Sequence, residues 1–261
     1  FENSSTGYIE RDQQGKQNSY NYNYWSSPVS KRGGANNSNY TVSDVLRGGT
    51  VSSSPKIINF GDGAYFADGD FISPIKISNR WIWSYKSLTP DSNSDWDNYY
   101  QWQYKANTGL IGVAEGFTMK GTGGVYSVEK LQNYVFTGKP NSGTISLFLA
   151  IYQTYLVGNP YPSALDANEF IKDNIKDCFD CRGSQNSFGG ALYFWDHFGL
   201  SNSHILAEYE GGYATYTLTG GVPGINDSSL TLNDGTSGVK TPGRYIPVGQ
   251  GFFIDGDLDL E

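Results

Sequence analysis

Residues 155–171 read YLVGNPYPSALDANEFI, and the six residues Gly158-Asn159-Pro160-Tyr161-Pro162-Ser163 at their centre decide the interpretation of the fold. A related phrase, YNYWSSPVS, occupies residues 22–30. In both phrases a strand-like segment is followed by a small polar residue, a proline and then a serine. The residue before a proline is excluded from the helical region and proline fixes φ, so each phrase predicts an extended segment that turns sharply. A corner that occurs twice indicates architecture rather than catalysis.

Two further pairs of phrases support an internal duplication. Aromatic strand signals occur at 79–87 (NRWIWSYKS) and 191–199 (ALYFWDHFG), and closing phrases occur at 113–121 (VAEGFTMKG) and 248–256 (VGQGFFIDG). Pro28 and Pro160 are 132 positions apart and the glycines before Phe117 and Phe252 are 135 apart, whereas Trp83 and Trp195 are only 112 apart. The phrases occur in the same order in both halves, but the offset of the middle phrase is smaller. Two copies with loops of different length would give this pattern.

Strand signals dominate the chain. RWIWSY (80–85), NYVFTG (133–138), ATYTLTG (214–220) and GFFIDG (251–256) are typical of strands. Only residues 41–48 and 163–177 have helical spacing, the second with Ser163 as the expected N-cap. The sequence therefore predicts a mostly β fold of two pseudo-repeated β-sandwich- or barrel-like halves, residues 1–140 and 141–261, each with one short helix and packed as one unit.

The composition is that of an extracellular β protein. Aromatic residues make up 15% of the 261 residues, and charged residues only 17%, against about 25% in an average domain. The net charge is −8 and no Lys/Arg cluster exists, which argues against nucleic-acid binding. The same charge disfavours sulfated or uronic polysaccharides unless Ca²⁺ bridges them. No apolar run reaches 18 residues, so membrane insertion is not expected.

The two cysteines, Cys178 and Cys181, form a C-x-x-C pair. Such a pair can be redox-active, half of a zinc site or a small disulfide loop. A redox role would need a βαβ context, and zinc would need further ligands beyond His197 and His204. A local disulfide or a pair of idle thiols is therefore the expectation.

The chain also resembles a known kind of module. The phrases YNYWSSPVS, YVFTGKPNSGTI, LVGNPYPSALDANEFI, LYFWDHF, GGYATYTLTGGVP and GRYIPVGQGFF cover nearly the whole chain. They are similar to a module of large secreted proteins of Bacteroidetes, especially flavobacteria, which are often exported by the type IX secretion system. The resemblance implies a segment of a longer parent chain, located outside the outer membrane or secreted. It implies no defined reaction.

Catalytic motifs are weak. The candidate carboxylates for glycan hydrolysis, which needs two acids across a cleft, are Asp95, Asp97, Glu115, Asp196, Glu208 and Glu210. None lies in a recognisable motif, and a Gly-x-Ser-x-Gly elbow is absent. Asp196 and His197 are strand neighbours that point to opposite faces, and Glu115 occupies the position of Gln250 in the second half. We therefore expect no enzyme.

A glycan site is predicted at SDWDNYYQWQYK, residues 94–105. Flat aromatic rings stack on pyranose faces, and neighbouring acids and amides take the hydroxyls. The candidate ligand-binding residues are Trp96, Tyr99, Tyr100, Trp102, Asp95 and Asp97. The alternative is that the face with Tyr100, Trp102 and Tyr104 is core, as we expect for Trp81, Trp83 and Tyr85.

An acidic loop is a candidate calcium site. FGDGAYFADGDF carries Asp62, Asp68 and Asp70, and calcium takes six to eight oxygen ligands. Asp-Gly pairs also mark ordinary turns, so an ordinary turn is the alternative to a calcium site here.

These observations predict a non-catalytic module of a secreted or surface-anchored bacterial protein that serves adhesion or polysaccharide binding. The alternatives are a purely structural spacer and a glycan-degrading enzyme. An exposed aromatic cluster with polar neighbours would favour binding, and two facing carboxylates in a groove would favour the enzyme.

Overall fold

The computed structural model describes residues 5–61, 68–87, 101–123, 130–198, 203–205, 208–225, 238 and 240–256. Within these residues the fold is mostly β, with two short α-helices, which confirms the predicted class. Each sheet is an open path of strands with two ends, and the strands are antiparallel except in one small pair.

Three larger sheets carry the fold. The first contains β1 (Ile9–Lys16), β11 (Leu131–Pro140), β4 (Leu46–Gly48) and β5 (Lys56–Ile57), with β3 (Val29–Ser30) beside β11. The second has the order β2 (Tyr22–Trp25), β10 (Phe117–Lys120), β8 (Trp83–Tyr85), β9 (Trp102–Tyr104). The third has the order β12 (Thr154–Gly158), β18 (Gly251–Asp255), β14 (Leu192–His197), β15 (Gly211–Thr217), β16 (Gly220–Val222).

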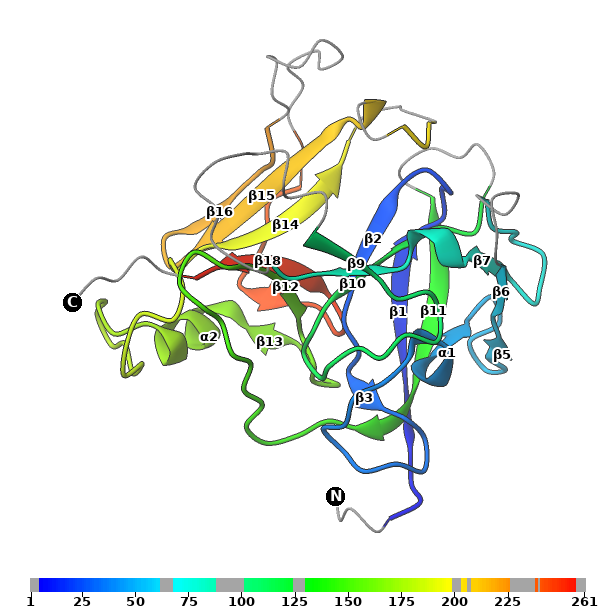
Figure 1. Ribbon diagram of the computed structural model, residues 1–261, viewed down its shortest axis with the longest axis horizontal. Coiled ribbons are helices and arrows are strands. Elements are labelled where there is room, and N and C mark those ends of the chain that lie inside the picture. The colour runs from blue at the N-terminus through cyan, green and yellow to red at the C-terminus, as the bar shows by residue number, and fades with distance from the viewer. Residues whose placement is uncertain are drawn as a thin grey trace.

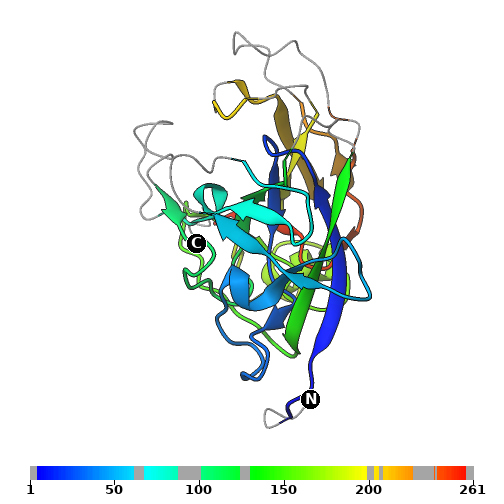
Figure 2. The same cartoon turned by 90° about the vertical axis from the view of Figure 1, so that its right-hand side faces the viewer.

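The remaining elements are short. They are the pairs β13 (Leu165–Asp166) with β17 (Tyr245–Ile246) and β6 (Asn59–Gly61) with β7 (Lys76–Ser78), the helices α1 (Val42–Val45) and α2 (Ala167–Asn174), and a 3₁₀ turn at Asn79–Trp81. Figure 1 shows the third sheet at the upper left and centre, and Figures 1 and 2 both show β1 and β11 running side by side.

The second and third sheets have the same strand order and the same register. Phe117 of β10 pairs with Trp25 of β2, and Phe252 of β18 pairs with Val157 of β12. These are the residues that the two sequence alignments place in equivalent positions. Both phenylalanines are buried, at 0% and 1% exposure, as expected for core residues. The correspondence supports the duplication, which stays a prediction.

The middle strands correct one part of that alignment. Thr118 of β10 pairs with Trp83, whereas its equivalent Phe253 pairs with Tyr193. Tyr193, rather than Trp195, therefore occupies the place of Trp83. A shift of two residues keeps the same face of the strand outward, so the hydrophobic pattern alone does not reveal it.

The two predicted halves contact each other through backbone. Isolated bridges join Trp25 to Gln250 and Glu115 to Val157. The alignment makes Trp25 equivalent to Val157 and Glu115 equivalent to Gln250, so the two bridges join the same pair of positions with the halves exchanged. A further bridge joins Lys86 to Tyr155. The boundary near residue 140 remains a prediction, but the described strands on each side of it are joined by direct pairing.

Asn141 ties the two proline corners together. It is 2% exposed, its backbone N–H donates to the carbonyl of Pro28 at 3.2 Å, and its Nδ2 donates to the carbonyl of Pro160 at 3.1 Å. Its Oδ1 accepts from the Ser30 hydroxyl at 2.7 Å. Buried backbone carbonyls need such partners, so the corners have a structural role.

Both helices are shorter than the sequence predicts, since α2 begins later and α1 ends earlier. Strand β13 precedes α2, and the N-cap is Asp166, whose Oδ1 accepts from the Asn168 N–H at 3.0 Å. The expectation that Ser163 caps this helix is wrong, because its carbonyl lies against Asn159 Nδ2 in the preceding corner. Helix α1 has four residues and passes directly into β4.

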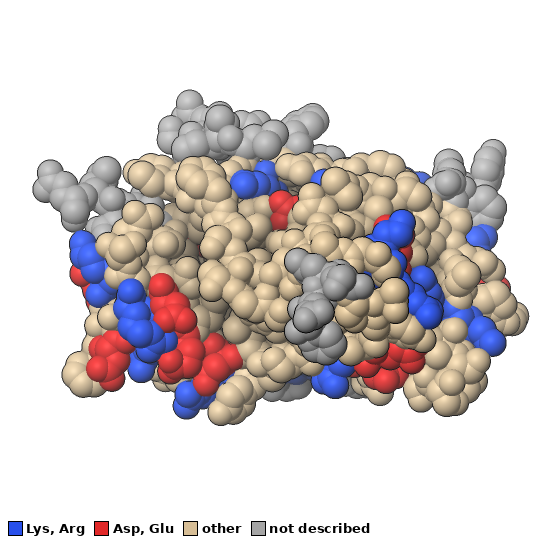
Figure 3. All heavy atoms as spheres, turned by 90° about the horizontal axis from the view of Figure 1, so that it is seen from below, with Lys and Arg blue, Asp and Glu red and all other residues tan. Residues whose placement is uncertain are grey.

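The surface carries intermixed charges. On the face shown in Figure 3 acidic and basic side chains lie next to one another, and large areas are uncharged. The ion pairs of Arg182 with Glu169 and Asp173, at 2.7 and 2.6 Å, are examples beside α2. Cys178 and Cys181 form a disulfide, which is one of the two outcomes that the sequence predicted. No described helix has the length and apolarity needed to cross a bilayer.

Candidate functional site

An aromatic pocket lies where the second and third sheets meet. Its volume is about 270 Å³, and all of its lining residues except one are aromatic: Tyr22, Tyr24, Trp81, Trp83, Trp102, Thr118, Trp195, Tyr209 and Tyr213. Pockets that bind small molecules are lined by apolar and aromatic groups in this way. We call this cavity the aromatic pocket.

Strand alternation places the tyrosines of β2 in the pocket. Tyr22 and Tyr24 are half-buried and face the pocket, whereas Asn23 and Trp25 point to the other side and are buried. Side chains alternate between the two faces of a strand, so one β-strand can serve both core and pocket. Trp25 accordingly belongs to the main hydrophobic core of the first half.

The third sheet supplies the opposite wall. Trp195 of β14 and Tyr213 of β15 are cross-strand partners, and their ring centroids are 5.1 Å apart in an edge-to-face arrangement. Tyr213 is 42% exposed. Cross-strand aromatic pairs stabilise a sheet and also hold each ring in a fixed position.

Phe253 forms the support beneath the pocket. It is 6% exposed, and the rings of Tyr24, Tyr85, Trp102 and Tyr213 meet it edge-to-face at centroid distances of 5.8, 5.5, 6.2 and 5.6 Å. Each such pair contributes about 0.5–1.5 kcal/mol beyond its buried area. The pocket rings are therefore held in place without a ligand, which lowers the entropy lost on binding.

The tyrosine hydroxyls in the pocket are neutral hydrogen-bonding groups. The hydroxyl groups of Tyr24 and Tyr213 lie close enough to influence each other, as do those of Tyr22 and Tyr209. Burial raises the pKa of Tyr213 to about 12, and it also raises the pKa of Tyr24 and of Tyr209. A protonated phenol can donate one hydrogen bond and accept another.

Lys120 lies inside a group of rings beside the pocket. Its side chain is 2% exposed, and Nζ lies 3.7 Å from the Trp81 ring centroid, 4.7 Å from that of Tyr22 and 4.8 Å from that of Tyr209. Burial lowers the pKa of this ammonium group to about 7. The aromatic faces act in the opposite direction, because they attract a cation.

Two polar groups contact the Lys120 ammonium group, and a third lies behind one of them. Nζ lies 3.0 Å from His204 Nδ1 and contacts the Tyr209 hydroxyl, and His204 Nε2 lies 3.2 Å from Asp68 Oδ1. The His204 ring stacks on Trp81 at 4.9 Å. Burial and the Lys120 charge lower the pKa of His204. These contacts hold the segment at His204 against the edge of the pocket.

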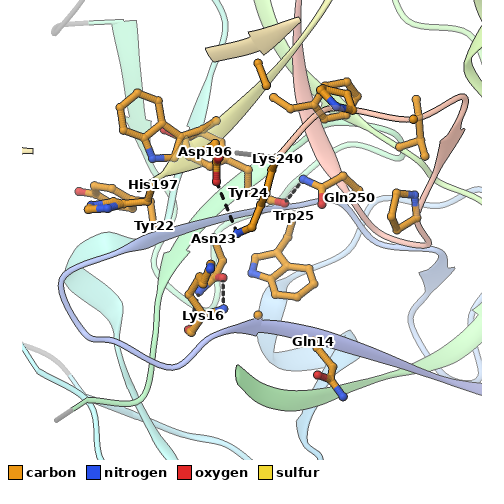
Figure 4. Close-up of a pocket in the computed structure, with 18 of the residues that line it drawn as sticks. Gln14, Lys16, Tyr22, Asn23, Tyr24, Trp25, Asp196, His197, Lys240 and Gln250 are labelled. Carbon is orange, nitrogen blue, oxygen red and sulfur yellow. Dashed lines mark hydrogen bonds and ion pairs between the residues drawn. The ribbon is translucent and has the colours of Figure 1, made fainter. Parts of the chain in front are cut away.

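A second cavity adjoins the aromatic pocket. Its volume is about 510 Å³, and β1, β2, β14 and residues 240–247 contribute to its lining. Tyr22, Tyr24 and Trp195 line both cavities. Figure 4 shows Asp196 and Lys240 directed toward each other across it, and their charged atoms are 3.5 Å apart. We call this space the polar cavity.

The structure places one of the predicted glycan-binding residues in the aromatic pocket. Trp102 lines it and is half-buried. The other predicted residues, Asp95, Trp96, Asp97, Tyr99 and Tyr100, lie outside the described residues. The prediction for that loop therefore stays a prediction.

The predicted calcium residues are only partly described. Asp62 lies outside the described residues, Asp68 contacts His204, and Asp70 Oδ1 accepts from the Ile72 N–H at 2.9 Å. Across the described ranges, no group of three or more His, Cys, Asp or Glu side chains is arranged to hold a metal ion. Calcium binding stays a prediction.

Sequence analysis missed most of the aromatic pocket. The face of the segment 80–85 that carries Trp81, Trp83 and Tyr85 was predicted to be core. Tyr85 and Trp81 are buried, as expected, but Trp83 and Trp195 are half-buried and line the pocket. The aromatic alternation in the segments 80–85 and 193–197 is the signal that could have indicated the pocket. The sequence does not show that the two sheets meet at these residues.

Glu115 has a structural position, as its alignment with Gln250 suggested. Its Oε2 accepts from the Gly112 N–H at 2.7 Å, and its Oε1 accepts from the Tyr155 hydroxyl. The backbone carbonyl of Glu115 accepts from Ser26 Oγ at 3.0 Å. These bonds join β12 to the segment that leads into β10.

Comparison with known families now gives one match. The profile of the family described as Domain of unknown function (DUF8693) matches residues 67–259, about three quarters of the chain. The chain belongs to this family. The matched DUF8693 region contains β7–β18 and most of the aromatic pocket, whereas β1–β6 precede it. No curated protein and no solved structure matches the chain at a significant level.

Proposed function

We propose that this DUF8693 protein is a non-catalytic carbohydrate-binding module, and that the aromatic pocket holds a sugar ring. The observation that carries the proposal is the wall of half-buried rings, Trp83, Trp102, Trp195 and Tyr213, around a cavity of about 270 Å³. Large aromatic groups left partly exposed and close together mark binding surfaces. Pyranose C–H groups pack against such rings, and the Tyr24–Tyr213 hydroxyl pair offers hydrogen bonds to sugar hydroxyls.

We also propose that the module acts outside the cytoplasm, as part of a secreted or surface-anchored bacterial protein. The Cys178–Cys181 disulfide supports this location, because disulfides persist in oxidising compartments. The low share of charged residues, 17%, supports it too. The similarity to exported Bacteroidetes modules and their type IX secretion rests on the sequence phrases alone.

The proposal is tested by a glycan array followed by affinity electrophoresis on the polymers that bind. Trp102→Ala removes one wall of the pocket, and we expect it to weaken binding at least about tenfold, as truncation of an aromatic hot spot does. Phe179→Ala is the matched control, since this aromatic ring is 88% exposed and lies on the disulfide loop away from the pocket.

Each arm of the test has a distinct outcome. Equal retardation of wild type and Trp102→Ala would contradict the assignment to the aromatic pocket. No binding to any glycan would favour a structural spacer, and release of shorter products would favour a glycan-degrading enzyme. Repeating the array with Ca²⁺ and with EDTA tests the calcium prediction.

A further inference from the structure

The polar cavity contains buried polar atoms that have no hydrogen-bond partner among the described residues. They are both ring nitrogens of His197, Oδ2 of Asp196, Nε1 of Trp195 and Nε1 of Trp25. All four residues line the cavity, and His197 is only 4% exposed. A buried polar atom left without a partner costs about 1–3 kcal/mol, so several of them around one cavity indicate that something else bonds to them.

The set of unpartnered atoms is mixed in character. The two indole N–H groups donate, and the Asp196 oxygen accepts. Burial and the charges of Lys16, Lys120 and Lys240 lower the pKa of His197 to about 4. At neutral pH this ring is therefore uncharged, with one nitrogen that donates and one that accepts.

This character distinguishes between classes of ligand. An anionic group such as a carboxylate or sulfate only accepts hydrogen bonds, so it would leave the accepting atoms unpaired and would face the Asp196 carboxylate. A cationic group would meet Lys240, whose Nζ lies 3.5 Å from Asp196. A hydroxyl group both donates and accepts, and it can satisfy every member of the set.

The size and position of the polar cavity fit a sugar unit. A volume of about 510 Å³ lies within the range of small-molecule sites. Tyr22, Tyr24 and Trp195 line both cavities, so the two spaces adjoin. A ligand that is held in the aromatic pocket is therefore next to the polar cavity.

We infer that the polar cavity is a second sugar subsite, which binds the hydroxyls of a neutral pyranose unit while the aromatic pocket holds a neighbouring unit of the same oligosaccharide. This inference rests on the proposed function. It adds that the ligand is an uncharged oligosaccharide and that His197 and Asp196 are its specificity-determining residues.

The test is isothermal titration calorimetry with cellohexaose, mannohexaose and laminarihexaose, with the corresponding disaccharides, and with hexagalacturonate as the acidic comparator. A variant, His197→Phe, keeps a ring of similar size and removes both nitrogens. We expect it to weaken binding of the neutral hexasaccharide about tenfold and to leave disaccharide binding within twofold of wild type. Phe179→Ala serves again as the control, and the thermal midpoint of each variant reports its folding.

A second measurement needs no variant. The chain has only 2 histidines, so the ring ¹⁵N resonances of His197 can be distinguished from those of His204. We expect the His197 resonances to shift when the neutral hexasaccharide is added and to stay in place with the disaccharide.

The outcomes separate the two proposals. If no oligosaccharide on the array or in the titrations binds wild type, the proposed function fails and this inference fails with it. If a hexasaccharide binds through Trp102 but His197→Phe binds equally well and the His197 resonances do not shift, only the second subsite is overturned. Tighter binding of hexagalacturonate, or equal affinity for disaccharide and hexasaccharide, would also overturn it.

Discussion

The buried ammonium group of Lys120 predicts that the stability of this protein depends on pH in a particular direction. In the folded protein, burial lowers the pKa of Lys120 from 10.5 to about 7, with a further lowering by Arg80 and an opposing effect of Asp68. In the unfolded chain the group regains its ordinary pKa. Between these two pH values the unfolded chain therefore holds one more proton than the folded protein.

The sign and size of the effect follow from this difference. Stability rises with pH wherever the unfolded state binds more protons, by about 1.4 kcal/mol per pH unit for one proton. Below pH 7 the folded protein carries the full unfavourable energy of the buried charge. Raising the pH from 6 to 9 should therefore increase the free energy of unfolding by about 2.5 kcal/mol through Lys120 alone.

The assay compares wild type with Lys120→Met between pH 6 and pH 9. Urea unfolding followed by tryptophan fluorescence gives the free energy at each pH, and the difference between the two proteins cancels the titrating groups that do not interact with Lys120. We expect Lys120→Met to gain stability relative to wild type at pH 6, with this advantage falling by about 2–3 kcal/mol at pH 9. Lys120→Arg is the control, since arginine stays charged throughout this range.

A stability difference that is the same at pH 6 and pH 9 would refute the reasoning. It would mean that the rings of Trp81, Tyr22 and Tyr209 compensate for the buried charge and keep the ammonium group protonated. A direct titration of the Lys120 side chain by ¹⁵N-lysine NMR decides between the two, with a midpoint near pH 7 in the first case and near the ordinary lysine value in the second.

Three further predictions test the architecture. Ala114 and Gly249 hold equivalent left-handed backbone positions, with φ of 67° and 68°, so Ala114→Gly should raise stability by about 1 kcal/mol and Gly249→Ala should lower it by at least as much in thermal unfolding. If Ala114→Gly lowered stability and Gly249→Ala raised it, the equivalence of the two positions would be contradicted. Asn141→Ala removes the Nδ2 donor to the buried carbonyls of Ser27 and Pro160, one in each proline corner, and should lower the free energy of unfolding by about 2–4 kcal/mol. A change below about 0.5 kcal/mol would show that the Asn141 side chain does not hold the corners together. Replacing Cys178 and Cys181 by serine opens a loop of only four residues, and should lower stability by no more than about 2 kcal/mol.

Local sequence signals located most of the central strands. The predicted segment 133–138 lies within β11, and the predicted segment 251–256 agrees with β18 to within one residue. Their apolar residues and glycines are bounded by turns, and this pattern favours a strand over a helix. The helix boundaries were less accurate. The first residues of the predicted segment 163–177 form a turn and strand β13 instead, because the corner at Ser163 and β17 bond to their backbone groups. The last residues of the predicted segment 41–48 form strand β4.

The aromatic pocket could not be predicted in the same way. Trp83 and Trp195 have the alternation of core residues, and the pattern holds no information on which face meets another sheet. Their partial exposure depends on the contact between the second and third sheets, which joins residues far apart in the chain. Lys120 differs from these tryptophans in the opposite sense, because it is buried although its local sequence does not predict burial.

The position of β2 has a practical consequence for work on this family. The region matched by the DUF8693 profile starts at residue 67, yet Tyr22 and Tyr24 come from a strand that precedes it and pairs along β10. A polypeptide trimmed to the profile boundaries would expose one edge of the second sheet and lose a wall of both cavities. Fragments intended for crystallisation or ligand screening should therefore retain the first 66 residues, and profiles of the family would gain by extending toward them.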